Sequence, residues 1–338
     1  MNTSHINNSK NIVKLWSLTI IILLIIMIVV GGLTRLTDSG LSITKWDLFS
    51  GILPPLNNAD WIKYFALYKE IPQYKLMNFS MTLSEFKFIF FWEYIHRLLG
   101  RLIGLSLLFP LLYFSLKQML PYKYLKKFTI VFGLILLQGF VGWYMVKSGL
   151  VNEVTVSHYR LALHLTIAFI ILSSLVWIYL NINSNKYKIF FNFHKRTFLI
   201  QLLIFLLFLQ IVIGAYVSGL DAGRIYQTWP LMNENFFPSD MTWEDLFNFN
   251  NQSFVQFFHR NLAYLIFFLT IYIGYTIYTK NRSLITPYIY LASAVSIQIF
   301  LGIITLISSL NLYVALMHQF SSIFLISVSL NLYFRSIK

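Results

Sequence analysis

The 338-residue chain is 57% apolar and only 11% charged, and it carries a formal net charge of +14 without a single cysteine. Such a composition is typical of integral membrane proteins. The lack of cysteine excludes disulfides, iron–sulfur clusters, thiolate-ligated haem and redox-active thiol pairs. Any redox chemistry therefore needs an iron held by other ligands, or a diffusible cofactor.

Eight apolar stretches are each long enough to cross a hydrocarbon core of about 30 Å, which takes about 20 residues. No small-residue cleavage pattern follows the first stretch, so we expect it to stay in the membrane rather than to act as a signal peptide. The fold prediction is an all-α integral membrane protein with eight transmembrane helices. The expected spans are 15–34, 88–115, 124–146, 160–181, 197–217, 255–279, 286–307 and 313–334.

The segments that join these spans differ in charge. One set comprises both termini and the connections near 116–127, 182–196 and 280–285, and it holds 14 of the 26 basic residues and no acidic residue. All 12 Asp and Glu residues lie on the other side of the membrane or in adjoining helix turns. Since short loops rich in Lys and Arg mark the cytoplasmic side, both termini are expected to be cytoplasmic. The basic excess is a topology signal and does not indicate binding to nucleic acid.

The second half of the chain repeats the first, which predicts two pseudo-symmetric four-helix bundles, residues 1–181 and 182–338. Because each half has an even number of spans, the repeats should be parallel and related by an axis along the membrane normal. The matching positions are Gly31-Gly32 with Gly214-Ala215, His96-Arg97 with His259-Arg260, Gln138 and Gly142 with Gln298 and Gly302, and His164 with His318.

Four histidines, His96, His164, His259 and His318, fall near the start of the even-numbered spans, in one layer near the outer face. A membrane-embedded histidine is costly unless it has a partner, which makes it a functional candidate. A four-helix bundle can hold a porphyrin between two imidazoles, which gives a low-spin electron-transfer haem. Hydrogen bonding within the bundle or a proton relay would explain a single histidine. The duplication favours two bis-imidazole iron sites, His96 with His164 and His259 with His318.

Three arginines, Arg97, Arg101 and Arg260, lie near the same layer. A guanidinium there could bind a haem propionate through two hydrogen bonds. The alternative is a helix-end arginine that extends to the membrane interface. Because Arg97 and Arg260 each follow a histidine directly, the propionate role is favoured.

The two halves differ at the residue three positions before the first histidine, which is Glu93 in one half and Gln256 in the other. Glu93 lies one helical turn from His96 on the same face. A carboxylate at this depth could transfer protons or stabilise a cation, and a salt bridge to Arg97 is the alternative. The difference favours a reactive N-terminal site and an electron-transfer C-terminal site.

Two of the outer loops, about 35–87 and 218–254, are long and rich in aromatic residues. Segment 60–90 could form interfacial helices that cover the site, or it could belong to an ordinary aromatic belt at the membrane surface.

At these residues the chain closely resembles the haem A synthase family, membrane enzymes that supply haem A to terminal oxidases. The segments that carry the resemblance are 32–42, Pro54-Pro55, 85–87, 93–101 and 219–223, and they cover both halves. Some members carry a cysteine pair in the first outer loop. This chain has none and resembles the cysteine-free branch.

The resemblance implies oxidation of the C8 methyl of haem O to a formyl group by successive hydroxylations, which gives haem A. It also implies that His96 and His164 flank the iron of the substrate haem, and that His259 and His318 ligate a resident haem b. Glu93 would assist the methyl oxidation by stabilising a cationic intermediate. The implied location is a bacterial plasma (inner) membrane, with both haem sites near its outer face.

The implied partners are haem O synthase, cytochrome oxidase assembly factors, membrane lipid and an electron acceptor of unknown identity, with a homo-oligomer as one option. Two rival functions are weaker. A di-haem cytochrome b that moves electrons across the membrane needs haems at different depths, whereas the four histidines share one layer. A transporter with alternating access would be expected to have a broken helix or a charged residue at mid-membrane, and neither is evident.

Overall fold

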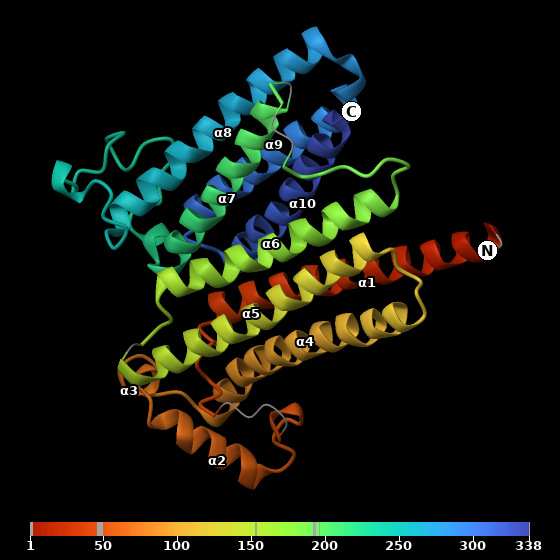
Figure 1. The fold of residues 1–338 in the computed structure, drawn as a ribbon. Coiled ribbons are helices and arrows are strands. Elements are labelled where there is room, and N and C mark those ends of the chain that lie inside the picture. Colours follow the sequence, from red (N-terminus) through yellow and green to blue (C-terminus); the bar gives the residue numbers. More distant parts are fainter. Residues whose placement is uncertain (1–2, 46–49, 153, 192–193, 196, 338) are drawn as a thin grey trace. The chain divides into compact units, whose positions relative to one another are not determined.

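The computed structural model describes residues 3–45, 50–152, 154–191, 194–195 and 197–337. Eight helices in these ranges are long and apolar enough to cross a membrane, which confirms the all-α prediction. The same ranges contain no β-strand beyond an isolated bridge between Met232 and Asn235. The α-helices, labelled in Figure 1, are α1 (Thr3–Leu36), α2 (Asn58–Lys69), α3 (Pro72–Leu76), α4 (Leu83–Leu116), α5 (Tyr122–Asn152), α6 (His158–Ile182), α7 (Phe198–Gly219), α8 (Gln252–Lys280), α9 (Ile285–Ile307) and α10 (Leu312–Ser336).

Several long helices begin at polar capping residues. Thr82 and Glu85 form a capping box at the start of α4, in which the Glu85 carboxylate accepts the Thr82 backbone N–H at 2.8 Å. The side chains of Asn251 and Asn311 accept backbone N–H groups in the first turns of α8 and α10. Such caps satisfy backbone N–H groups that have no partner within the helix. They explain why α4 begins before the expected residue 88, since hydropathy registers only the apolar part of a helix.

Packing divides the chain into two compact units, Met1–His164 and Leu165–Lys338. In the second unit α7 packs on α8, α8 on α9, α9 on α10 and α10 on α7, so these four helices close into a bundle. In the first unit α4 packs on both α1 and α5. The halves 1–181 and 182–338 and their pseudo-symmetry were inferred from the sequence repeat, not from packing, and they stay predictions.

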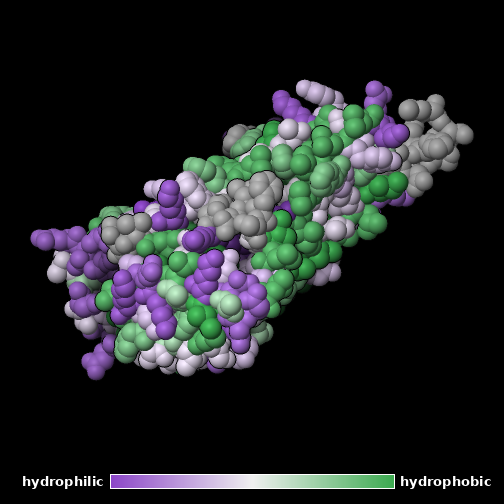
Figure 2. Space-filling view, turned by 90° about the horizontal axis from the view of Figure 1, so that it is seen from below, coloured by the Kyte–Doolittle hydropathy of each residue, from purple (hydrophilic) through white to green (hydrophobic). Residues whose placement is uncertain are grey.

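The spanning helices expose large apolar side chains. Phe109, Phe140, Phe268 and Phe300 are each at least 60% exposed. Figure 2 shows a broad hydrophobic band on one face of the molecule, with hydrophilic residues gathered at its two ends. This distribution is expected of a chain surrounded by lipid along its length and by water at both ends.

The first outer loop is folded onto the membrane helices of the first unit. Helix α2 packs on α4 and α3 packs on α5, and segment 60–90 is helical over most of its length. That these helices cover the haem site stays a prediction. The buried side chains of this loop cluster are Leu41, Ile43, Phe65, Tyr68, Ile71, Phe86, Ile89 and Phe90. Burial raises the pKa of the Tyr68 hydroxyl, which donates to Gln73 Oε1 at 3.0 Å.

The second outer loop is organised around Asp240. Its carboxylate accepts hydrogen bonds from the hydroxyls of Ser253, at 2.6 Å, and of Tyr226. Burial alone would raise the pKa of Asp240, but the hydrogen bonds from Ser253 and Tyr226 outweigh burial and hold this pKa below its usual value. Ser253 lies in the first turn of α8, so the carboxylate ties the loop to that helix.

We expect Phe86→Ala to destabilise the first outer loop by about 3–5 kcal/mol, the usual cost of truncating a fully buried phenylalanine. The Phe86 ring is 0% exposed and stacks on Phe65 at a centroid distance of 5.0 Å. Thermal unfolding in nanodiscs, with limited proteolysis of residues 50–82, would measure the effect. Phe88→Ala is the matched control, because Phe88 lies on the same helix and is 55% exposed. Equal losses in both variants would contradict the role given to the cluster.

Candidate functional site

His96 on α4 and His164 on α6 face each other within the first unit. Their ring centroids lie 6.4 Å apart, with 46° between the ring planes. Two metal–nitrogen bonds of about 2.0 Å, plus about 1.1 Å from each nitrogen to its ring centroid, would separate two imidazoles on opposite sides of one metal by about 6.2 Å. The pair therefore has the spacing of two axial ligands on one iron, and these residues fit a haem.

The side chains around the histidines indicate which kind of metal site the pair can form. In the part of the chain that the structure describes, no group of three or more His, Cys, Asp or Glu side chains is placed to hold a metal ion. A haem iron needs only one or two side-chain ligands, because the porphyrin supplies four nitrogens. Paired histidines without a third ligand suit a haem better than a structural zinc site, which takes four protein ligands.

Each of the four histidines lies against a glycine of the preceding membrane-spanning helix. Small residues let neighbouring helices approach closely in membranes, and here the space left by each missing side chain is filled by an imidazole edge. A Cβ atom added at the glycine would lie very close to the Cε1 atom of the histidine in all four cases: Gly31 to His96, 3.1 Å; Gly142 to His164, 3.0 Å; Gly214 to His259, 3.1 Å; and Gly302 to His318, 2.9 Å.

Three of the four histidines are also held through their backbone by a glutamine one turn before the glycine. The amide Nε2 of each glutamine donates to the carbonyl oxygen of the histidine. The three contacts are Gln138 to His164 at 3.0 Å, Gln210 to His259 at 3.1 Å, and Gln298 to His318 at 3.1 Å. The sequence Gln-x-x-x-Gly thus marks a helix that positions a histidine on the next spanning helix.

In the second unit the imidazole rings themselves have polar neighbours. The amide nitrogen of Gln210 lies 3.2 Å from both ring nitrogens of His259. His318 Nδ1 lies 3.1 Å from the backbone oxygen of Gln298, to which it can donate, and this leaves Nε2 for a metal. Metal-binding histidines usually donate their second N–H to such a carbonyl, which fixes the tautomer and the ring orientation. Of these two rings, His318 therefore has the contact that orients a metal-binding histidine, and the pairing of His259 with His318 on one iron stays a prediction.

The rings of the first unit are restrained less. His96 Nδ1 and His164 Nδ1 are both buried, and neither has a hydrogen-bond partner among the described residues. The amide oxygen of Gln138 is likewise buried and unpartnered within that set. The two halves therefore share the glycine contact and differ in how firmly each ring is oriented.

Glu93 lies one turn before His96 on α4, and both of its oxygens are engaged. Oε2 accepts from Ser42 Oγ at 2.7 Å and from the Ile43 backbone N–H at 2.8 Å. Oε1 accepts from Arg97, with Nη2 at 2.5 Å and Nε at 3.1 Å. The side chain is only 3% exposed. The salt bridge considered from the sequence is therefore present, and the same carboxylate ties the segment after α1 to α4.

Gln256 has the corresponding position in the second unit, and it makes a corresponding contact. Its Nε2 donates to the backbone oxygen of Tyr226 at 2.8 Å, so it ties the segment after α7 to α8. The two residues hold outer segments in the same way, but only Glu93 brings a charge. Electrostatics, rather than architecture, distinguishes the halves here.

The arginines that follow the histidines also bind outer-loop carbonyls. Arg97 donates to the backbone oxygens of Ile43 at 2.9 Å and Lys45 at 3.3 Å. Arg260 donates to Tyr226 and Thr228, both at 2.9 Å, and to Leu231 at 3.2 Å. Arg260 Nε is buried without a partner among the described residues. The propionate role of Arg97, Arg101 and Arg260 stays a prediction, and loop anchoring is a second role that sequence reasoning missed for Arg97 and Arg260.

Sequence reasoning also missed the structural role of the glutamines. The match between 138–142 and 298–302 was visible, but Gln210-x-x-x-Gly214 shows the same spacing on α7 and was not grouped with it. That spacing, seen in three of the odd-numbered spans, was the available signal. It indicates a helix-hairpin unit that occurs four times, a finer repeat than the duplication of halves.

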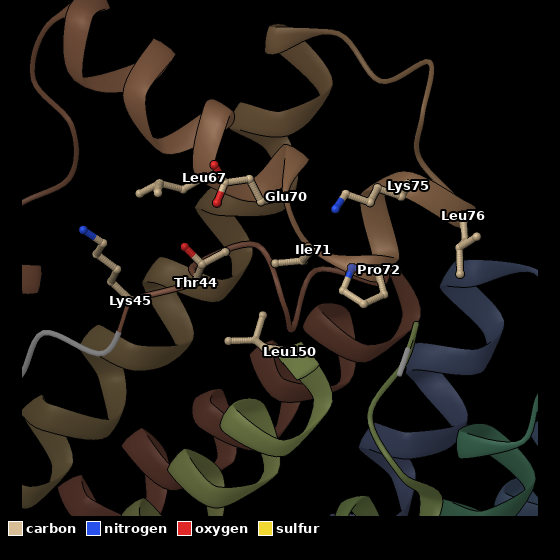
Figure 3. A pocket seen from close by; sticks show the side chains of 9 residues that line it. All are labelled: Thr44, Lys45, Leu67, Glu70, Ile71, Pro72, Lys75, Leu76 and Leu150. Atoms are coloured by element: carbon tan, nitrogen blue, oxygen red, sulfur yellow. The ribbon is translucent and has the colours of Figure 1, made fainter. Parts of the chain in front are cut away.

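A cavity of about 570 Å³ lies beside the loop helices of the first unit. Figure 3 shows its lining side chains, which come from the segment after α1, from α2 and α3, and from the end of α5. None of the four histidines lines it, and two lysines and a glutamate do. We therefore do not assign the haem to this cavity. Its lining residues are Thr44, Lys45, Leu67, Glu70, Ile71, Pro72, Lys75, Leu76 and Leu150.

We expect Gly142→Ala to displace the His164 ring and to cost about 1–3 kcal/mol of stability, the usual penalty for overpacking a well-packed site. The new methyl group would lie 3.0 Å from His164 Cε1. Gly139→Ala is the matched control on α5, because a Cβ there meets nothing within 4 Å. Optical and electron paramagnetic resonance spectra of reconstituted protein should show less low-spin haem in the first variant only. An unchanged low-spin signal in Gly142→Ala would refute the tight contact.

Comparison with known proteins identifies the family of the chain. Residues 14–330 match the model of the family COX15-CtaA, described as cytochrome oxidase assembly protein. The chain is 49% identical over 326 residues to the Heme A synthase of Pelagibacter ubique, covering 95% of this chain and 96% of that protein. It is 43% identical to the Heme A synthase of Rickettsia bellii over 94% of this chain and 96% of that one.

A third relative, the Heme A synthase of a Wolbachia species of Brugia malayi, is 39% identical over 93% of both chains. The match of the family model contains six of the eight candidate membrane helices whole and most of the first and the last. With paired histidines on a membrane-helix scaffold and identities of this size along nearly its whole length, the chain belongs to the COX15-CtaA family of cytochrome oxidase assembly proteins.

Proposed function

We propose that this integral membrane protein is a haem A synthase, an oxidoreductase that converts haem O to haem A for terminal oxidases. The observation that carries the proposal is the 6.4 Å separation of the His96 and His164 rings, which suits one iron between two imidazoles. Three relatives that match nearly the full chain bear the name Heme A synthase.

The N-terminal pair, His96 and His164, holds the substrate haem O, and His259 and His318 hold a resident haem b. When bound, haem b supplies a one-electron relay that accepts electrons removed from the substrate. The firm orientation of the His259 and His318 rings by Gln210 and Gln298 supports permanent occupancy of the second site. The Nε atom of Arg260, buried and without a described partner, leaves a donor for a haem propionate.

The chemistry consists of two successive hydroxylations of the C8 methyl of haem O with oxygen from water. The resulting geminal diol loses one water to leave the formyl group, and the conversion releases four electrons and four protons in all. His96 and His164 orient the macrocycle, and the buried Glu93 carboxylate lies one turn from His96, where a negative charge stabilises cationic character at the substrate. Arg97 and Ser42 hold this carboxylate in one position. The electrons leave through an acceptor of unidentified chemistry.

The proposed setting is a bacterial plasma membrane with both termini in the cytoplasm and both haem sites near the outer face. The basic residues at the termini and in three connecting segments support this orientation. Membership in a family of cytochrome oxidase assembly proteins supports delivery of haem A toward an oxidase. Haem O synthase, which makes the substrate, is the expected upstream partner, and a homo-oligomer is compatible with these roles.

The test is to purify the full chain from cells that make haem O and to separate the extracted haems by chromatography with mass spectrometry. Haem A, or its hydroxylated intermediate, together with haem b is the expected result. Haem b alone, with haem O supplied and unchanged, would overturn the proposal in favour of an electron-transfer cytochrome.

A further inference from the structure

The four helix hairpins that present the histidines are alike in three cases and different in the fourth. Gln138, Gln210 and Gln298 each stand four residues before the glycine that contacts a histidine, and each donates to that histidine's carbonyl oxygen. On α1 the glycine is Gly31, and the residue four positions before it is Met27. A thioether has no hydrogen to donate, so the backbone of His96 has no corresponding donor at this position.

Met27 instead packs on α4 one turn beyond His96. Its Cε atom lies 3.5 Å from the place where a Cβ of Gly100 would stand. The residues four positions after the other three histidines are Ala168, Ala263 and Ser322, all of which have a Cβ. Gly100 therefore makes room for the methionine, and the exchange of glutamine for methionine is accommodated by the local packing.

The polar contacts of the imidazole rings also differ among the four hairpins. The Gln210 amide nitrogen lies 3.2 Å from each ring nitrogen of His259, and that of Gln298 lies 3.3 and 3.4 Å from those of His318. His164 keeps a glutamine on its backbone alone. His96 has neither contact, and its buried Nδ1 lacks a partner in the described ranges. The Nδ1 atoms of His96 and His164 are thus both without a described partner, and His96 differs from the other three histidines in that its backbone also lacks the glutamine contact.

Groups beyond the coordinating atoms set how tightly a ligand holds its metal. Groups that orient a coordinating histidine support its bond to the metal, and the loss of such an outer partner typically costs about 10–100-fold in metal affinity or activity. A resident cofactor benefits from such support. A substrate that must enter and leave as product needs at least one ligand that dissociates readily.

We propose that His96 is the exchangeable ligand of the substrate haem, and that Met27 is the positioning residue that keeps it so. On entry a bond forms between the iron and a nitrogen of His96, and on release this bond breaks with the electron pair remaining on the imidazole. His164, anchored by Gln138, stays with the iron until last. The inference rests on the proposed function, because it treats the N-terminal haem as substrate.

The test is the rate at which each haem passes from the full-length protein in nanodiscs to excess apomyoglobin, with haems O, A and b separated by chromatography. Met27→Gln restores the donor found in the other hairpins and should slow the loss of haem O and haem A by about 10-fold or more. It should also slow multiple turnovers and raise the fraction of low-spin haem.

Gln210→Met is the reciprocal variant on α7, and it should speed the loss of haem b by about 10-fold or more without affecting the loss of haem O. Ile26→Gln is the control for an added amide on α1, because Ile26 is 43% exposed beside Met27. It should exchange haem at the wild-type rate.

If Met27→Gln folds and converts haem O but loses haem O at the wild-type rate, the ligand-exchange proposal is overturned and the proposed function stands. If Ile26→Gln slows the loss of haem O as much as Met27→Gln does, the ligand-exchange proposal is likewise overturned. If Met27→Gln fails to fold, Gln138→Met carries the test, since removing the amide that anchors His164 should speed the loss of haem O. No acceleration there would overturn the proposal. Wild-type protein that makes no haem A would instead refute the proposed function, before any variant is compared.

Discussion

Glu93→Gln should keep both haems bound and lose formyl formation by about 100-fold or more, the contribution typical of a positioned acid–base or charged group. Glutamine retains an oxygen for Ser42 Oγ and the Ile43 N–H, and Arg97 keeps the carbonyl oxygens of Ile43 and Lys45. The fold should therefore survive while the negative charge is lost. Haem analysis of the purified variant, with product measured against bound substrate, gives both quantities at once.

Two controls separate the charge of Glu93 from its role in holding the outer segment. Ser42→Ala removes one hydrogen bond to Oε2 but keeps the charge, so formyl formation should fall only a few-fold. Gln256→Glu places a carboxylate at the matching position of the second unit and should create no new activity there. Full activity in Glu93→Gln would refute the catalytic role. A loss in Ser42→Ala as large as that in Glu93→Gln would assign the effect to the loop contact.

His259→Ala is expected to remove haem b, and His96→Ala to spare it, while both variants lose formyl formation. Each change would delete one of the two histidines that would hold a haem, so the loss should exceed the about 10–100-fold that deletion of an outer-shell partner costs. The two variants should differ in haem b content because His96 pairs with His164 in the first unit, whereas His259 and His318 belong to the second unit. The haem content of each purified variant, with the low-spin signals in electron paramagnetic resonance, measures the effect.

The pattern of haem loss tests the pairing itself. His164→Ala should match His96→Ala in sparing haem b, and His318→Ala should match His259→Ala in losing it. Loss of the same haem in all four variants would contradict two independent sites. Retention of full activity in His259→Ala would contradict the role of haem b as the first electron acceptor.

Much of the fold could be predicted because its signals are local. An apolar stretch of about 20 residues must form a helix in lipid, since the backbone can satisfy its hydrogen bonds in no other way along a single segment. All eight expected spans have counterparts among the described helices. The ends were predicted less well, because caps such as Thr82 with Glu85 are polar and lie outside the apolar stretch.

The candidate ligands could also be named in advance, because four histidines at duplicated positions in apolar helices are costly without partners. The residues that contact the candidate site residues could not be named from the sequence. Glu93 was expected near the reacting group or paired with Arg97, and the structure adds Ser42 and Ile43 from a segment about fifty positions away in the chain. The contacts of Arg97 and Arg260 with loop carbonyls depend on how each loop folds back, and no local pattern encodes that.

By itself, then, the sequence determined the number and composition of the spanning helices, the charge asymmetry between their connections, and the positions of the four histidines, since each follows from residue type and spacing along one segment. Only the tertiary structure decided which rings face each other, why Gly31, Gly142, Gly214 and Gly302 lack a side chain, and where the Glu93 charge is held. Those features depend on the rotation of each helix about its axis and on the approach of neighbouring backbones. Both are set by packing between residues far apart in the chain.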